Sequence, residues 1–294
     1  MRIRQGIAVA ATAGLVLTGC GEGSTSPSSS NVEMDASTCD ALAEEYPGLE
    51  GRELTVGISP APANYSASDP SNPENIIGIE PDLLDAAGEC LGFTTEYSKL
   101  DFAGLVPALQ SGRLDLVAAG MYSSPERVQE VDFVEYMKAG EAALVAAGNP
   151  KGLDDLSKVC DVTAALVVGT VENEILSEQS DKCEAEGQPP IETLSFPSID
   201  RAQSALALGE ADIVLTDAGV AAYLAEKASD KLAVGFDLPT EFRFGFAVNK
   251  EDTELRDGLH AALMQLHEDG TLQDAVKQWG FDESQELEPA VATD

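Results

Sequence analysis

The sequence contains Leu109-Gln-Ser-Gly112-Arg-Leu-Asp115-Leu-Val117-Ala-Ala-Gly120 and, 97 residues later, Leu206-Ala-Leu-Gly209-Glu-Ala-Asp212-Ile-Val214-Leu-Thr-Asp217. Leu, Gly, Asp and Val stand at the same offsets in both stretches. Each stretch is typical of the last turn of an amphipathic helix, a glycine free to take the left-handed C-terminal cap, and a short apolar strand. A generic helix–strand connection has the same form, but agreement over about ten residues favours two halves that share one architecture.

The loops that follow these two strands carry opposite charges. In open α/β sheets, the loops beyond the carboxyl ends of the strands form the ligand crevice. The first loop leads to Arg127, and the second begins at Asp217. A cation on one half and an anion on the other predict a clamp for a zwitterion. The alternatives are that Arg127 pairs with Glu130 on the surface and that Asp217 is only a helix N-cap.

Strands and helices alternate in two blocks around the repeated pattern. Hydrophobic periodicity predicts strands at residues 53–58, 93–98, 114–119, 164–168, 191–195, 211–216 and 244–248. It predicts helices at residues 82–91, 102–111, 171–178, 199–208, 218–228, 252–267 and 271–279, with a further helix start at Ser124-Pro125-Glu126-Arg127. Two such blocks indicate an α/β protein of two lobes with largely parallel sheets.

Two extended stretches, residues 142–147 and 241–248, are expected to cross between the lobes. Such a pair of strands would form a hinge beside a cleft. We therefore expect lobe 1 at residues 53–140 and 243–284, lobe 2 at residues 141–242, and an acidic tail at residues 285–294.

Residues 1–19 have the pattern of an export signal. Arg2 and Arg4 precede an apolar run of 12 residues, which is too short to span a bilayer as a helix. The run ends at Leu17-Thr-Gly-Cys20, which resembles the bacterial lipobox and implies that Cys20 becomes a lipidated N-terminus. A plain cleavable signal peptide is the alternative. Residues 20–52 would then be a lipid-anchored tether and N-terminal extension, which places the protein on the extracytoplasmic face of the cell membrane.

The composition excludes one class of partner. The 294 residues, 44% of them hydrophobic, are enough for two ordinary domains with a sizeable core. The formal net charge of −35 repels phosphate backbones, and no basic run offsets it. We therefore expect no nucleic-acid partner, and we expect a soluble monomer beyond the lipid anchor.

Four cysteines besides Cys20 point to disulfides, because an even number in an exported chain is typical of a disulfide framework. Three pairings are possible. We expect Cys160 to pair with Cys183 around one strand–helix unit, and Cys39 to pair with Cys90. Their spacing fits no zinc pattern, and two histidines on one helix are more often surface residues than ligands, so we expect neither a metal nor a cofactor.

Several motifs in a fixed order carry a family resemblance. They are Phe102-Ala-Gly-Leu-Val-Pro-Ala-Leu-Gln-Ser-Gly-Arg-Leu-Asp-Leu-Val-Ala-Ala-Gly-Met-Tyr-Ser-Ser-Pro-Glu-Arg127, Val131-Asp-Phe133, Val168-Gly169-Thr170, Ala211-Asp-Ile-Val-Leu-Thr-Asp217 and Asp269-Gly-Thr-Leu-Gln-Asp-Ala-Val-Lys-Gln-Trp-Gly280. Over residues 53–283 the chain resembles the bacterial extracellular solute-binding proteins of family 3, the receptors of polar amino-acid ABC importers. The resemblance implies a two-lobe periplasmic-binding-protein fold of type II.

The resemblance also implies a ligand site. Arg127 would bind the α-carboxylate of an amino acid, and Asp217 would accept from its α-ammonium. Amides at Gly169 and Thr170 would add donors to the carboxylate, and the Phe102 ring would pack on the ligand side chain. The full candidate set is Arg127, Asp217, Thr170, Gly169, Phe102, Tyr122, Gly120, Val171, Tyr65 and Glu172.

Three departures from the family pattern bear on specificity. Tyr122 stands where the family usually has a carboxylate-binding hydroxyl, and Val171 replaces a second hydroxyl. After the first strand, Ser59 stands where an acid is usual, which argues against a ligand with a cationic side chain. The departures therefore concern both the carboxylate clamp and the identity of the ligand.

These features predict a receptor that captures an amino acid or related zwitterion by cleft closure and delivers it to a membrane permease. The ligand is expected to dock first on the lobe that carries Phe102, Tyr122 and Arg127. The alternatives are an enzyme of dehydratase type on the same fold, with Glu172 as its acid, and a ligand-sensing module. No Ser–His–Asp set is plausible with two histidines on one helix, so we expect no enzyme.

Overall fold

The computed structural model describes residues 32, 34–59 and 64–294. The predicted signal peptide, Cys20 and the Gly/Ser-rich tether of residues 21–30 lie outside the described residues. In the described part of the chain, no helix is long and apolar enough to cross a membrane.

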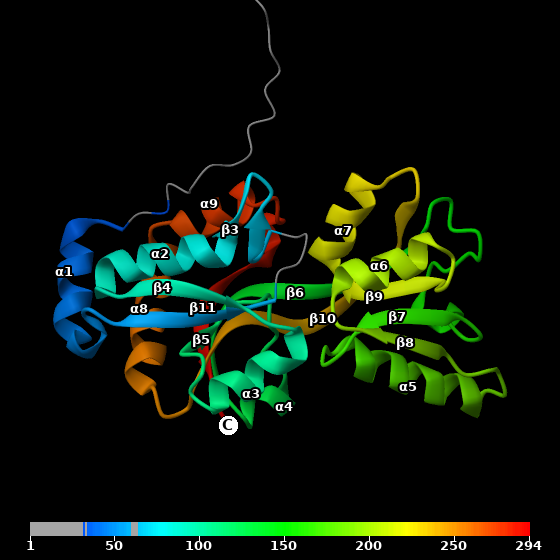
Figure 1. Cartoon of the computed structure of the whole chain (residues 1–294), viewed down its shortest axis with the longest axis horizontal. Helices are drawn as coiled ribbons and strands as arrows, with labels where there is room; N and C mark the ends of the chain where they lie inside the picture. The colour runs from blue at the N-terminus through cyan, green and yellow to red at the C-terminus, as the bar shows by residue number, and fades with distance from the viewer. Residues whose placement is uncertain (1–31, 33, 60–63) are drawn as a thin grey trace, which may run out of the picture.

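Lobe 1 is built around a parallel sheet with helices on both faces (Figure 1). Its strands are β1 (Glu53–Ile58), β4 (Thr94–Lys99) and β5 (Leu116–Val117), with β1 in the middle. Its helices are α1 (Ala36–Glu45), α2 (Ile79–Leu91), α3 (Leu105–Gln110), α4 (Pro125–Val128), α8 (Thr253–Glu268) and α9 (Thr271–Gln278). The apolar side chains of β1, Leu54, Val56 and Ile58, lie on one face of the sheet and are fully buried in a core that includes residues of α2 and α8.

Lobe 2 repeats this arrangement. Its parallel strands are β7 (Thr163–Val167), β8 (Glu192–Phe196) and β9 (Ile213–Asp217). Its helices are α5 (Glu172–Ala185) on one face and α6 (Ile199–Ala207) and α7 (Ala218–Lys227) on the other (Figure 1). Every residue of β9 is buried, so Asp217, at its carboxyl end, enters the interior of the molecule.

Two long strands join the lobes. The strands β6 (Asp132–Ala146) and β10 (Leu232–Val248) pair antiparallel and run from one lobe into the other (Figure 1). They connect the parallel strands of both lobes into one sheet of order β4-β1-β5-β10-β6-β9-β7-β8. The stretches predicted to cross between the lobes lie within these two strands, and the two-lobe α/β fold is confirmed.

The repeated sequence pattern has the same structure in both lobes. Gly112 and Gly209 have φ angles of +70° and +75°, as the predicted helix caps require. The shared aspartate accepts a hydrogen bond from the neighbouring parallel strand: Thr55 N donates to Asp115 at 2.8 Å, and Thr163 N donates to Asp212 at 2.9 Å. The pattern therefore encodes the helix end, the strand and the link to the next strand.

The acidic tail expected at residues 285–294 is part of the sheet. Strand β11 (Glu286–Ala292) pairs antiparallel with the lobe 1 part of β6. In lobe 2 the corresponding edge of β6 is covered by β9, so without β11 the lobe 1 edge would expose unpaired backbone groups. His267 also holds the strand, with Nδ1 at 2.7 Å from Glu286 Oε1. The sequence pattern did not predict α1 or the hairpin of β2 (Ala67–Asp69) and β3 (Asn72–Ile77) either.

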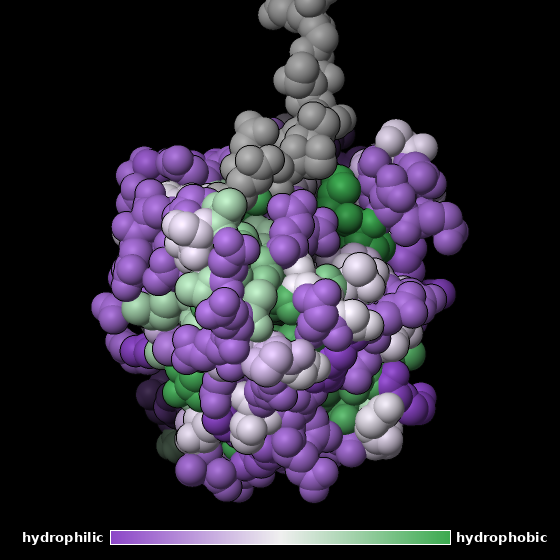
Figure 2. All heavy atoms as spheres, turned by 90° about the vertical axis from the view of Figure 1, so that its left-hand side faces the viewer, coloured by the Kyte–Doolittle hydropathy of each residue, from purple (hydrophilic) through white to green (hydrophobic). Residues whose placement is uncertain are grey.

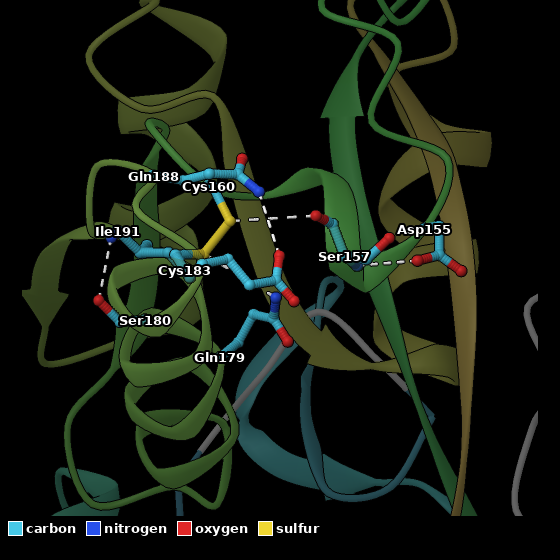
Figure 3. The surroundings of a disulfide bond; sticks show 9 residues. Asp155, Ser157, Cys160, Gln179, Ser180, Cys183, Gln188 and Ile191 are labelled. Carbon is cyan, nitrogen blue, oxygen red and sulfur yellow. Dashed lines mark hydrogen bonds between the residues drawn. A yellow bond between two sulfur atoms is a disulfide. The ribbon is translucent and has the colours of Figure 1, made fainter.

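Both expected disulfides are present, Cys39–Cys90 and Cys160–Cys183. The first attaches α1 to α2. The second attaches the segment before β7 to α5. Figure 3 shows this disulfide beside Ser180, whose hydroxyl accepts a hydrogen bond of 3.0 Å from Ile191 N. The second disulfide and this hydrogen bond together fix α5 against the β7–β8 edge of lobe 2.

Candidate ligand-binding site

A cavity of about 100 Å³ lies between the lobes. Its walls come from the loop after β5, from α4, from the start of α5 and from the end of β9. Nine of the ten candidate residues border it: Tyr65, Phe102, Gly120, Tyr122, Arg127, Thr170, Val171, Glu172 and Asp217. The structure therefore brings together side chains that the sequence places up to 152 residues apart.

Arg127 extends from lobe 1 to lobe 2. Pro125 opens α4, and the Ser124 side chain caps it by accepting from Arg127 N. The guanidinium donates to the carbonyl of Tyr122 and, across the cleft, to the carbonyl of Gly169, each at 2.9 Å. Its Cζ lies 5.3 Å from the centre of the Phe102 ring. Burial lowers the pKa of Arg127, and the nearby Glu172 carboxylate opposes this.

Asp217 is both a helix cap and a cleft residue. Its Oδ1 accepts from Val220 N at 3.0 Å, which caps α7, and from the Tyr65 hydroxyl at 2.8 Å. Its Oδ2 accepts from the Tyr122 hydroxyl at 3.1 Å. Burial raises the pKa of Asp217, while these three donors favour the ionised form. Oδ2 accepts from Tyr122 alone among these hydrogen bonds, and a carboxylate oxygen has two acceptor positions, so Oδ2 keeps one for a ligand.

Tyr122 fills the cleft wall on the lobe 1 side. Its ring stacks on Phe242 with centroids 5.3 Å apart and packs against Phe244 at 4.8 Å. The Tyr65 ring also packs against Phe244, with centroids 4.6 Å apart. The two phenol groups thus reach Asp217 from lobe 1 and form hydrogen bonds between the lobes.

The loop before α5 approaches lobe 1 closely. Gly169 has a φ of +83°, and a Cβ at this position would lie 3.1 Å from the Ala103 side chain, so only glycine fits. Gly169 is the one candidate outside the cavity wall, and its carbonyl accepts from Arg127. The Thr170 hydroxyl donates to Val167 O at 2.9 Å and therefore closes the turn locally.

Glu80 supports the lobe 1 wall from behind. Its carboxylate accepts from Gly120 N at 3.0 Å and from the hydroxyls of Ser66 and Tyr136 at 2.8 and 2.9 Å. Burial raises the pKa of Glu80 to about 7. This carboxylate therefore holds the loop that carries Gly120 and Tyr122.

Lobe 2 contributes one buried acid, Glu141, besides the predicted Asp217 and Glu172. Glu141 on β6 is 0% exposed and lies opposite Asp217 in the strand register, and Glu172 is 6% exposed. The expectation that the missing acid at Ser59 disfavours a cationic ligand stays a prediction, and Glu141 and Glu172 are buried carboxylates of the other lobe that it did not take into account. The available signal for Glu141 was a single acid at the start of an apolar crossing strand.

The described residues contain no group of three or more His, Cys, Asp or Glu side chains suited to a metal ion. His260 and His267 instead contact the C-terminal strand, through Pro289 O and Glu286. The site is thus assembled from one guanidinium, several carboxylates and aromatic rings.

Residues 54–283 match the model of the bacterial extracellular solute-binding proteins, family 3. The chain belongs to this family. As a family 3 protein it is similar to the arginine-binding protein ArgT of Corynebacterium glutamicum, with 33% identity over 254 residues, which cover 85% of this chain and 80% of the relative. It is also similar to the ABC transporter glutamine-binding protein GlnH of Bacillus subtilis, with 26% identity over 77% of this chain and 81% of the relative.

Solved structures of family 3 type agree with the fold. An ancestral arginine-binding protein bound to arginine matches with a TM-score of 0.71 and 26% identity, covering 79% of this chain and 99% of that chain. The ancestral amino acid-binding protein AncCDT-1, a precursor of cyclohexadienyl dehydratase, matches with a TM-score of 0.68 and 30% identity, covering 82% and 99%. This family 3 chain is a solute-binding protein and not an enzyme.

Proposed function

We propose that this chain is the receptor of an ABC importer, and that it binds a free amino acid between Arg127 and Asp217. The observation that carries the proposal is the position of these two opposite charges, one from each lobe, on a single cavity. Relatives named for arginine and for glutamine support an amino acid as the ligand.

The chemistry of the two side chains assigns the two ends of the ligand. The planar guanidinium of Arg127 matches a carboxylate, and its two bonds to carbonyls use two of its five N–H donors. The remaining acceptor position of Asp217 suits the α-ammonium. Because the two charges belong to different lobes, the ligand links the lobes and stabilises the closed cleft, which the permease then recognises.

The proposal includes a lipid anchor at Cys20, since Leu17-Thr-Gly-Cys20 has the lipobox pattern and the family is extracellular. Replacing Cys20 with alanine should release the protein from the membrane fraction into the medium. Retention of the variant on membranes would contradict the anchor.

Calorimetric titration with single amino acids tests the ligand class. At least one should bind, and Arg127→Gln and Asp217→Asn should each weaken its binding about ten- to a hundredfold, because each removes a charge-assisted hydrogen bond. Arg201→Gln and Asp200→Asn are matched controls, since both residues are exposed on α6. Equal binding by Arg127→Gln and the wild type would refute the clamp, and conversion of the ligand to a product would restore the enzyme alternative.

A further inference from the structure

The charges around the cavity are unbalanced. Arg127 is the single cationic side chain that borders it among the described residues, whereas lobe 2 places Asp217, Glu172 and Glu141 in one group. A zwitterionic ligand adds no net charge, and its ammonium needs one acid. Two carboxylates therefore have no role in the clamp of the α-groups.

These two carboxylates are buried with three of their four oxygens unpaired. Within the described part of the chain, the two carboxylate oxygens of Glu141 have no hydrogen-bond partner. The same is true of Oε2 of Glu172. Buried polar groups in native proteins are nearly always hydrogen-bonded, because an unpaired buried acceptor destabilises the fold. Glu172 borders the cavity, and Glu141 is near enough for the two charges to repel.

A structural role accounts poorly for the pair. No lysine or arginine side chain among the described residues forms a salt bridge with Glu141 or Glu172; Arg127 acts on Glu172 only at longer range, since its bonds go to backbone carbonyls. The competing explanation inside the protein is one proton shared between the two carboxyls. A ligand cation would satisfy the same oxygens.

We propose that Glu141 and Glu172 bind a positively charged group on the ligand side chain, so that the receptor takes a cationic amino acid with a distal ammonium or guanidinium group. The inference rests on the proposed function, because it presumes that Arg127 and Asp217 hold the α-carboxylate and the α-ammonium. Glu141 belongs to a strand that crosses between the lobes, so the group that it binds lies at the hinge side of the cleft.

The protonation of Glu141 and Glu172 provides a second way to detect a bound cation. Burial, together with the neighbouring acids, raises the pKa of Glu141 well above its ordinary value, and burial raises the pKa of Glu172. The groups that face this pair are Asp217, Tyr122 and Arg127. A cation at hydrogen-bond distance favours the ionised carboxylates, so its binding releases protons.

Arginine and citrulline separate charge from shape, because citrulline replaces the guanidinium by a neutral urea of nearly the same size. Titration calorimetry of the wild-type protein should show arginine binding at least about tenfold more tightly than citrulline. In Glu141→Gln and in Glu172→Gln this ratio should fall toward one, while Glu178→Gln, at an exposed position of α5, should leave it unchanged. Calorimetry in buffers of different ionisation enthalpy should show proton release for arginine and much less for citrulline.

The outcomes separate the two proposals. If a neutral amino acid such as glutamine or citrulline binds as tightly as arginine, the cation inference fails and the receptor function stands. A preference for arginine that neither glutamine variant changes also overturns the role of the pair. If no amino acid binds, the proposed function itself fails. The ratio of arginine to citrulline affinity in the wild-type protein, and the proton release on arginine binding, test the cation inference even if a variant does not fold.

Discussion

At the scale of residues, Asp217 combines two tasks in one carboxylate. It caps α7 through Val220 N, and it receives the hydroxyls of Tyr65 and Tyr122 from the opposite lobe. In the closed form these donors fix the orientation of the carboxylate, so the bound ligand meets an acceptor that is already held in place.

Glu80 gives a pH-dependent prediction at the same scale. Burial raises its pKa from 4.5 to about 7, so the folded state holds a proton that the unfolded state releases. The stabilisation from this proton is complete below about pH 4.5 and is lost as pH rises to about 7. Glu80→Gln cannot ionise, so its unfolding free energy should increase relative to that of the wild type between pH 5 and pH 8, by on the order of 3 kcal/mol. Its melting temperature should rise relative to the wild type over the same pH range.

Differential scanning fluorimetry of both proteins across this pH range measures the difference. Glu178→Gln is the control, because that side chain is exposed. A melting-temperature difference between Glu80→Gln and the wild type that stays constant with pH would show that Glu80 is ionised in the folded protein at both ends of the range.

Individual site residues differ in how far the sequence predicts them. Arg127 and Asp217 follow the carboxyl ends of two strands with strong patterns, so their loops meet in any fold of this class. Glu141 depends on the antiparallel register that sets it opposite Asp217, and no local pattern encodes that register. The orientation of the Tyr122 ring likewise depends on Phe242 and Phe244, which lie 120 or more residues away in β10.

At the scale of elements, the repeated helix–glycine–strand unit explains why the order of strands and helices was predictable. Each unit contains its own cap and its own link to the neighbouring strand, so local sequence is sufficient. Strand β11 was not predictable in this way. It is acidic and lacks a strong period, and it forms a strand only because the edge of β6 is open in lobe 1.

The disulfide Cys160–Cys183 supports a prediction for lobe 2. It closes a loop of 23 residues around β7 and most of α5, and in the chain-entropy model such a cross-link stabilises the fold by about 3 kcal/mol. The double variant Cys160→Ser, Cys183→Ser should therefore unfold at lower urea concentration than the wild type. Reduction of the wild-type protein also breaks Cys39–Cys90, so it should lower the midpoint at least as far as the double variant does. An unchanged midpoint in the double variant would show that the Cys160–Cys183 bond contributes nothing.

At the scale of the whole molecule, the inter-lobe contacts fit a receptor that closes on its ligand. The end of lobe 1 that faces away from lobe 2 carries mainly hydrophilic side chains, with apolar ones only in small groups (Figure 2). The lobes meet through Arg127 with Gly169 and through the two tyrosines with Asp217, and these bonds surround the cavity. A ligand that adds bonds to both sides shifts the population toward this closed form.

The crystal structure of the protein with L-arginine tests this arrangement most directly. The ligand should lie in the cavity between the lobes, with its carboxylate at hydrogen-bond distance from the Arg127 guanidinium, its α-ammonium on Asp217, and its guanidinium beside Glu141 and Glu172. An arginine bound in the cavity with its carboxylate away from Arg127, or found only on the outer surface, would contradict the two-lobe clamp.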